Sequence, residues 1–129
     1  MENQQTIINY RISRAEESLE EAIILAQNKH WNACVNRLYY ACFYAVNALL
    51  LSKQIFSSKH SGVRSLFNRH FVKTSIISIQ NAYIYNDLFE RRQESDYEDL
   101  FTFNAKDVEP WIDQARQFIS SINQLLSSR

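Results

Sequence analysis

Two adjacent arginines and the acidic segment that follows them form the densest charged cluster of the sequence. Residues 91–97 read RRQESDY, and Arg92 lies four positions before Asp96. Residues four apart share one face of a helix, so these two side chains can form an ion pair. A solvated pair of this kind contributes at most about 0.5 kcal/mol. Alternatively, Arg92 is held in a cleft, where a planar guanidinium can clamp a phosphate group. The sequence leaves both interpretations open.

The segment with the strongest loop composition is residues 57–62, which read SSKHSG and contain the one glycine of the chain. One interpretation is that a helix ends here with Gly62 in a left-handed conformation, and that a new helix then begins. The other is an anion pocket, in which backbone N–H groups at the new helix start act with Lys59 and His60. Both interpretations predict a helix boundary at this segment.

The pattern over residues 31–52 predicts a helix with apolar or aromatic groups on two opposite sides. One side is a continuous apolar stripe. The other side carries three aromatic residues and a single charge: Asn36, Arg37, Tyr40, Phe43, Tyr44 and Asn47. Tyrosine and arginine are enriched at binding hot spots, and they also stack on unpaired bases. We favour a dimer interface at Tyr40, Phe43, Tyr44 and Asn47, because the stripe continues along the whole helix.

Helical periodicity dominates the rest of the chain as well. Apolar residues recur at helical spacing over about residues 5–28, 63–71 and 76–99, and a last helix is expected to begin at Asp107, with Pro110 in its first turn. One glycine and one proline are too few to punctuate a sheet of hairpins. These patterns predict a single all-α domain over residues 1–129, an up-and-down bundle of four to five helices.

Composition and missing motifs exclude several classes of function. The formal net charge is zero, so the whole-domain basic field of a strong duplex-DNA binder is absent. The sequence has no glycine-rich phosphate loop and no zinc-binding motif, so we expect no cofactor and no metal. Cys34 and Cys42 lie too far apart on one helix for a disulfide, which suits a reducing compartment. We detect no signal peptide and no apolar run that could span a bilayer, and we expect a cytoplasmic protein without membrane contact.

Three short segments together resemble a HEPN domain, the higher-eukaryote and prokaryote nucleotide-binding family. They are NRLYYA at 36–41, KHSGV at 59–63 with FVKT at 71–74, and the arginine segment 91–97 with its Asp96-Tyr97 pair. Their order and spacing are similar to one branch of prokaryotic HEPN proteins. The resemblance extends from about residue 10 to residue 125.

This resemblance implies a helical bundle that forms a homodimer about a two-fold axis. HEPN proteins are often partnered with a small nucleotidyltransferase, which can act as the antitoxin of a toxin–antitoxin pair. Many are metal-independent ribonucleases, in which an Arg and a His four to six residues further on line a cleft at the dimer interface. There the ribose 2′-hydroxyl attacks the adjacent phosphate, while Arg stabilises charge and His moves protons.

The sequence departs from this nuclease pattern because it lacks the histidine that should follow the arginine. Asp96 and Tyr97 stand where the histidine after Arg92 is expected. Arg64 and His70 have a suitable separation, but they lie in the wrong segment and about 120° apart on a regular helix. The sequence does not show whether the fold brings His60 to Arg92.

We therefore expect a HEPN protein of the toxin or RNA-associated type, which binds RNA or a nucleotide phosphate and could be a metal-independent endoribonuclease. The alternative is a non-catalytic helical subunit that holds a small nucleotidyltransferase. The predicted catalytic residues are His60, Arg92, Asp96 and Tyr97, and the predicted ligand-binding residues are Asn36, Arg37, Tyr40 and Lys59.

Overall fold

The chain forms an all-α bundle, as the sequence predicts. The structure is a computed structural model that describes residues 2–97 and 102–128, without the side chains of Glu2 and of residues 94–97. Within these ranges it contains five α-helices and one turn of π-helix: α1 (Glu2–Gln27), α2 (Trp31–Ser52), α3 (His60–Phe67), η1 (Asn68–Val72), α4 (Ile79–Tyr97) and α5 (Ala105–Ser127).

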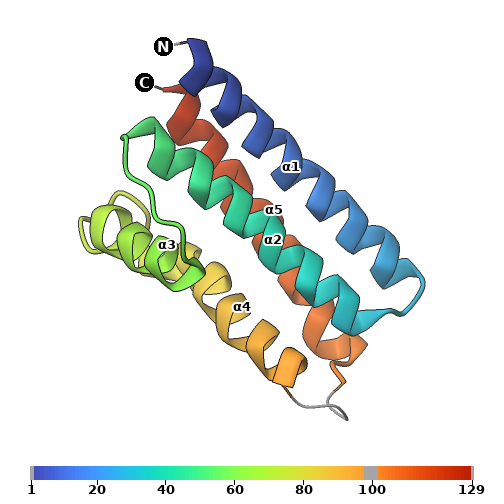
Figure 1. Ribbon diagram of the computed structural model, residues 1–129. Coiled ribbons are helices and arrows are strands. Elements are labelled where there is room, and N and C mark those ends of the chain that lie inside the picture. Colours follow the sequence, from blue (N-terminus) through green and yellow to red (C-terminus); the bar gives the residue numbers. More distant parts are fainter. Residues whose placement is uncertain (1, 98–101, 129) are drawn as a thin grey trace.

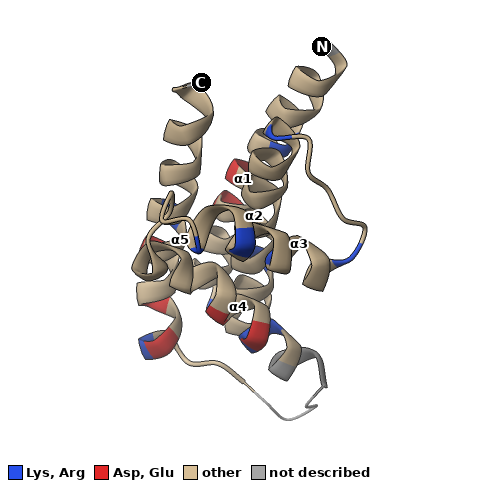
Figure 2. Cartoon of the chain, turned by 90° about the vertical axis from the view of Figure 1, so that its left-hand side faces the viewer, with Lys and Arg blue, Asp and Glu red and all other residues tan. Residues whose placement is uncertain are grey.

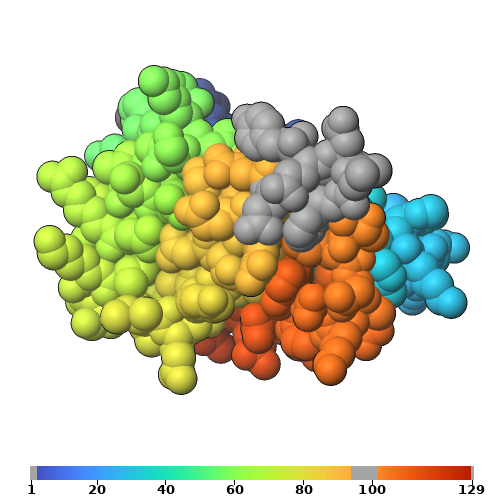
Figure 3. All heavy atoms as spheres, turned by 90° about the horizontal axis from the view of Figure 1, so that it is seen from below, coloured from blue at the N-terminus to red at the C-terminus, as the bar shows by residue number. Residues whose placement is uncertain are grey.

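The four long helices run in alternating directions, and α3 lies at one side of the bundle, near the start of α4 (Figure 1). Helix α1 packs along α2, α5 packs behind them, and α4 closes the bundle on the side of α3. Seen from below, α4 lies between the α3 region and α5 (Figure 3). Helix α2 therefore has neighbours on several sides, and it packs against α1, α3, α4 and α5.

The composition of α2 explains why it occupies this central position. Half of its residues are buried: Cys34, Val35, Leu38, Tyr39, Ala41, Cys42, Ala45, Val46, Ala48, Leu49 and Leu50. Both cysteines are free thiols, as their spacing predicts. Burial raises the pKa of Cys34 to about 11, so this thiol stays protonated and inert at neutral pH.

The expected helix boundaries are correct for α2, differ by three residues at the starts of α1 and α4, and are wrong at the third and last helices. The last helix begins before Asp107, because Asn104 is the N-cap and its side chain accepts a hydrogen bond of 2.9 Å from the Asp107 N–H. The third helix begins at His60, and a π-helical turn occupies 68–72. A π-turn adds a residue to the ordinary repeat, so a periodicity of 3.6 residues misplaces its end.

Gly62 does not end a helix, which corrects one of the two interpretations of the segment 57–62. It lies in the first turn of α3 without a positive φ. A Cβ at this position would collide with Oγ of Ser57 and lie 3.0 Å from its Cβ. The Ser57 hydroxyl in turn accepts a hydrogen bond of 3.2 Å from the backbone N–H of Lys59. Glycine thus accommodates the close approach of the Ser57 side chain to the first turn of the helix that carries His60.

Charged residues of both signs occur on the visible face of the bundle, where acidic residues gather toward the lower ends of α4 and α5 (Figure 2). Among the described residues, no helix is both long and apolar enough to cross a bilayer.

Replacing Gly62 with alanine tests the close contact with Ser57. Overpacking costs about 1–3 kcal/mol, and the higher helix propensity of alanine offsets up to about 1 kcal/mol. We therefore expect Gly62→Ala to lower the free energy of unfolding by about 1 kcal/mol, measured by urea denaturation.

The matched background is Ser57→Gly, which removes both atoms that the new Cβ would meet. In this background Gly62→Ala is expected to be neutral or stabilising. An equal loss in both backgrounds would show that Ser57 is not the reason for glycine.

Candidate functional site

The fold brings His60 and Arg92 to the same tyrosine, although they are 32 positions apart in the sequence. Oη of Tyr39 lies 2.8 Å from Nδ1 of His60. Cζ of Arg92 lies 4.6 Å from the centre of the Tyr39 ring and 6.0 Å from that of Tyr40. Three elements position these groups, because Tyr39 belongs to α2, His60 begins α3 and Arg92 lies on α4.

Aromatic rings hold the His60 imidazole in place. The ring stacks on Phe43 at a centroid distance of 4.2 Å and meets Tyr40 edge-on at 5.8 Å. Tyr39 is fully buried, whereas His60, Tyr40 and Phe43 are partly exposed. We call Tyr39, Tyr40, Phe43, His60 and Arg92 the Tyr39 cluster. It combines a fixed imidazole, a guanidinium and a partly exposed aromatic surface.

The environment keeps His60 neutral at physiological pH. Partial burial, and then the positive charge of Arg92, lower the pKa of the imidazole from its usual range. Burial raises the pKa of the Tyr39 hydroxyl well above its usual range, and this outweighs the opposing effect of Arg92. At neutral pH the cluster therefore contains an uncharged imidazole, a protonated phenol and the permanent charge of Arg92.

Asn36 and Arg37 extend this cluster along α2. The Arg37 guanidinium donates to Oδ1 of Asn36 at 3.2 Å, and its Cζ lies 5.0 Å from the centre of the Tyr40 ring. It also forms an ion pair of 3.3 Å with Glu21 of α1. Such a partly exposed pair contributes about 0–1 kcal/mol, so a phosphate group could displace Glu21 at little cost.

For the other predicted site residues, Lys59, Asp96 and Tyr97, the structure describes no contact with the Tyr39 cluster. Lys59 is exposed at the N-cap of α3, and no contact among the described residues joins its side chain to the Tyr39 cluster. Asp96 and Tyr97 belong to the last turn of α4, but their side chains lie outside the described residues.

Arg64 and His70 are not brought into contact among the described residues. His70 is exposed on η1, whereas Arg64 lies one helical turn after His60 on α3. The Arg64 guanidinium sits over the Phe89 ring with Cζ at 4.0 Å and pairs with Glu90 at 2.9 Å.

The sequence pattern does not indicate a functional role for Tyr39, because the residue falls on the apolar stripe of α2. The Tyr39 side chain is fully buried in the structure, so its place in the core is correct. The available signal was the pair Tyr39-Tyr40 itself, since adjacent positions on a helix point about 100° apart. One tyrosine of such a pair can face the core while the other faces the surface.

The predicted dimer stripe is partly exposed along α2. Tyr40, Phe43, Tyr44 and Asn47 all have intermediate exposure. Helix α1 borders this stripe, where Cζ of Arg14 lies 5.3 Å from the centre of the Tyr44 ring. Arg11 donates to the backbone carbonyl of Asn47 at 3.5 Å.

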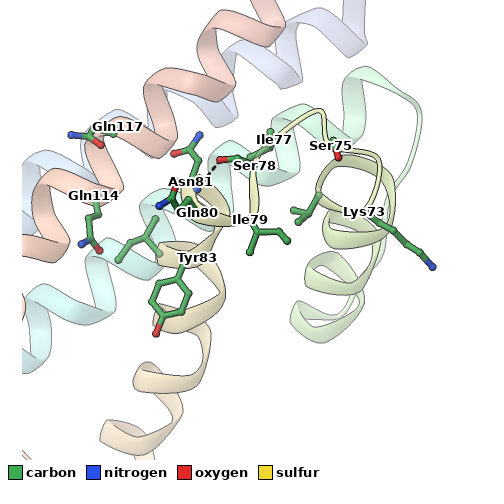
Figure 4. Close-up of a pocket in the computed structure, with 12 residues that line it drawn as sticks. Lys73, Ser75, Ile77, Ser78, Ile79, Gln80, Asn81, Tyr83, Gln114 and Gln117 are labelled. Atoms are coloured by element: carbon green, nitrogen blue, oxygen red, sulfur yellow. Dashed lines mark hydrogen bonds between the residues drawn. The ribbon is translucent and has the colours of Figure 1, made fainter.

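The molecule has a concave surface that shares no residue with the Tyr39 cluster. It is an open groove of about 1000 Å³ between the start of α4 and α5 (Figure 4). Ile79 and Tyr83 of α4 lie on one side of it, and Gln114 and Gln117 of α5 lie on the other. None of the predicted site residues lines it. Among the described residues, no group of three or more His, Cys, Asp or Glu side chains could hold a metal ion.

Comparison with known proteins agrees with this architecture. The HEPN domain family model matches residues 8–125. A "UPF0332 protein" from Thermotoga maritima is 43% identical over 98% of this chain and 96% of its own length. Two proteins from Methanocaldococcus jannaschii that are named "Putative toxin" are 32% and 35% identical, over 92% and 89% of this chain and 80% and 85% of their own lengths. The chain belongs to the HEPN family.

Proposed function

We propose that this HEPN protein is a toxin-type subunit that binds the phosphate backbone of RNA at the Tyr39 cluster. The observation that carries the proposal is the contact of Arg92 and His60, from two different helices, with the one buried Tyr39 ring. A guanidinium and an imidazole that both contact one tyrosine could donate to oxygens of the same phosphate group. The relatives named as toxins support the same class of function.

Arg92 supplies the charge for this binding. Its guanidinium is stacked near Tyr39 and Tyr40, which restricts its orientation and leaves the charge unchanged. Arginine suits phosphate because its planar fork can donate two parallel hydrogen bonds. Arg37, next to Tyr40, would contact a neighbouring phosphate.

His60 stands in place of the histidine that the segment after Arg92 lacks. Its pKa is lowered, so the ring is neutral near pH 7 and can take part in hydrogen bonding or proton transfer there. If the protein cleaves RNA without metal, Arg92 would stabilise the charge that develops on the phosphoryl oxygens. Binding requires only the contacts described, whereas cleavage also requires groups that accept and donate protons.

We further propose a homodimer across the α2 stripe. Helix α2 carries three partly exposed aromatic side chains, Tyr40, Phe43 and Tyr44, and Tyr10 of α1 is 62% exposed. Aromatic residues with few charges are characteristic of interface cores. Since Tyr40 also belongs to the Tyr39 cluster, a two-fold dimer of this kind would bring two phosphate sites to one interface.

The second candidate is a non-catalytic subunit that holds a small nucleotidyltransferase. The zero net charge favours it, because strong RNA binding usually draws on a basic field that this chain lacks. A subunit of this kind would bind its protein partner equally well without Arg92.

The first test is binding and cleavage of a mixed single-stranded RNA by the purified protein in EDTA, with Arg92→Ala beside it. We expect Arg92→Ala to weaken binding at least about tenfold, because a hydrogen bond to a charged group contributes about 1.5–3 kcal/mol. Any cleavage by the wild type should disappear with the same substitution.

The matched control is Arg116→Ala, which removes an exposed arginine of α5 that pairs with Asp113. It should leave RNA binding unchanged. Wild-type protein that neither binds nor cleaves RNA would reject the proposal in favour of the partner-subunit role.

The dimer is tested by Tyr44→Arg, measured by small-angle scattering. We expect the variant to be monomeric, because a charged side chain buried at an interface core without a partner is strongly unfavourable. Tyr83→Arg places the same charge in the groove between α4 and α5 and should remain dimeric. A dimeric Tyr44→Arg protein would show that another face makes the contact.

A further inference from the structure

The hydrogen bond between Tyr39 and His60 is unusual because its tyrosine is enclosed. The Tyr39 side chain has 0% exposure. Its ring is stacked with Tyr85 at 6.3 Å and meets Phe89 at 6.1 Å. The guanidinium of Arg92 lies over the same ring. The hydroxyl therefore cannot turn to bulk water, and its hydrogen-bond partner must be found inside the fold.

The possible partners can be counted within the part of the chain that the structure describes. There the Tyr39 hydroxyl makes one hydrogen bond, to Nδ1 of His60. A buried O–H donor left without an acceptor costs about 1–3 kcal/mol. If neutral His60 carried its proton on Nδ1, the ring would donate to Tyr39 and the phenol proton would have no acceptor. The lower-energy arrangement is the one in which Tyr39 donates to Nδ1.

We propose that Tyr39 is a positioning residue, whose hydroxyl donates to Nδ1 of His60 and holds the neutral imidazole in the Nε2–H tautomer. The proton on Nε2 then makes His60 a hydrogen-bond donor toward its ligand. Since a neutral imidazole has one donor and one acceptor nitrogen, the acceptor is already used by Tyr39. His60 is thereby matched to an acceptor-only group such as a phosphoryl oxygen.

This inference deepens the proposed function and rests on it for the identity of the ligand. It assigns His60 and Arg92 the same task, because both present N–H donors to one phosphate group. Protonation of His60 does not remove the Nε2–H donor, since the imidazolium carries a proton on each nitrogen. A ligand-bound phosphate would therefore keep this hydrogen bond on both sides of the His60 titration.

The groups that face the imidazole support a neutral donor at physiological pH. From α2 they are the phenols of Tyr39 and Tyr40, and from α4 the guanidinium of Arg92. Lys59 and Arg64 lie on or beside the same helix α3. Among the described residues, no carboxylate contacts the ring. Partial burial and the charge of Arg92 lower the pKa of His60. The imidazole is therefore neutral at physiological pH, and the hydrogen bond from Tyr39 decides which of its two nitrogens carries the proton.

The tautomer can be read directly from long-range ¹H–¹⁵N correlation spectra of the ¹⁵N-labelled full chain at about pH 8, where histidine is neutral. We expect wild-type His60 to show a protonated Nε2 and an Nδ1 shifted by an accepted hydrogen bond. A proton on Nδ1 would overturn the proposal. This measurement requires no RNA, so it stands even if the proposed function fails.

Tyr39→Phe removes the donor and keeps the ring. We expect the Nδ1 resonance of His60 to move to the position of a free acceptor. Binding of a short oligouridine should weaken about three- to tenfold, the loss expected when one hydrogen bond no longer orients a ligand-binding group. The chemical shift separates this role from a merely structural one, because it reports on Nδ1 itself: if Nδ1 accepted no hydrogen bond from Tyr39, removing the hydroxyl would leave its resonance in place.

The matched control is Tyr85→Phe. Tyr85 is also fully buried and stacks against Tyr39 with an angle of 15° between the rings, and its hydroxyl has no hydrogen-bond partner among the described residues. Its removal should leave both the His60 resonances and the affinity unchanged. Equal Nδ1 shifts in wild type and Tyr39→Phe would overturn the proposal, as would equal effects of the two substitutions.

Discussion

The enclosure of α2 is the constraint on which the rest of the molecule depends. A helix with apolar groups on one side needs one neighbour, whereas α2 is packed by four helices and still leaves an aromatic strip partly exposed. Because α2 is central, any side chain that it directs between α3 and α4 is enclosed by both. Tyr39 occupies this place, so the packing that stabilises the bundle also orders the groups that contact Tyr39.

Arginine in this fold associates with aromatic rings as much as with carboxylates. Arg14, Arg37, Arg64 and Arg92 each lie within about 6 Å of the centre of an aromatic ring. A ring face orients a guanidinium without neutralising it, whereas a carboxylate does both. Arg14, Arg37 and Arg64 also pair with carboxylates of Glu17, Glu21 and Glu90, so in these three cases a ring and a carboxylate orient the guanidinium together.

The sequence predicts the bundle and the bounds of α2 well, because a long helix with few breaks has an unambiguous period. The predicted helix end is wrong where one extra residue interrupts the helical period of 3.6 residues, as in the π-turn 68–72. The proximity of His60 to Arg92 was not predictable, since it depends on how loop 53–59 places α3 against α4. Asn104 was missed as a cap because Asp107, three residues later, is an equally suitable cap residue.

The short length of α3 has a consequence for how the molecule opens. This helix has eight residues and contributes two buried side chains, Val63 and Phe67, whereas α2 contributes eleven. Elements with few buried contacts have the lowest free energy of local unfolding. Opening of α3 would remove the imidazole from Tyr39 while Arg92 stays on α4. Amide hydrogen exchange should therefore be faster in α3 than in α2. An anion bound by His60 of α3 and Arg92 of α4 would slow the exchange of the α3 amides before that of the α2 amides.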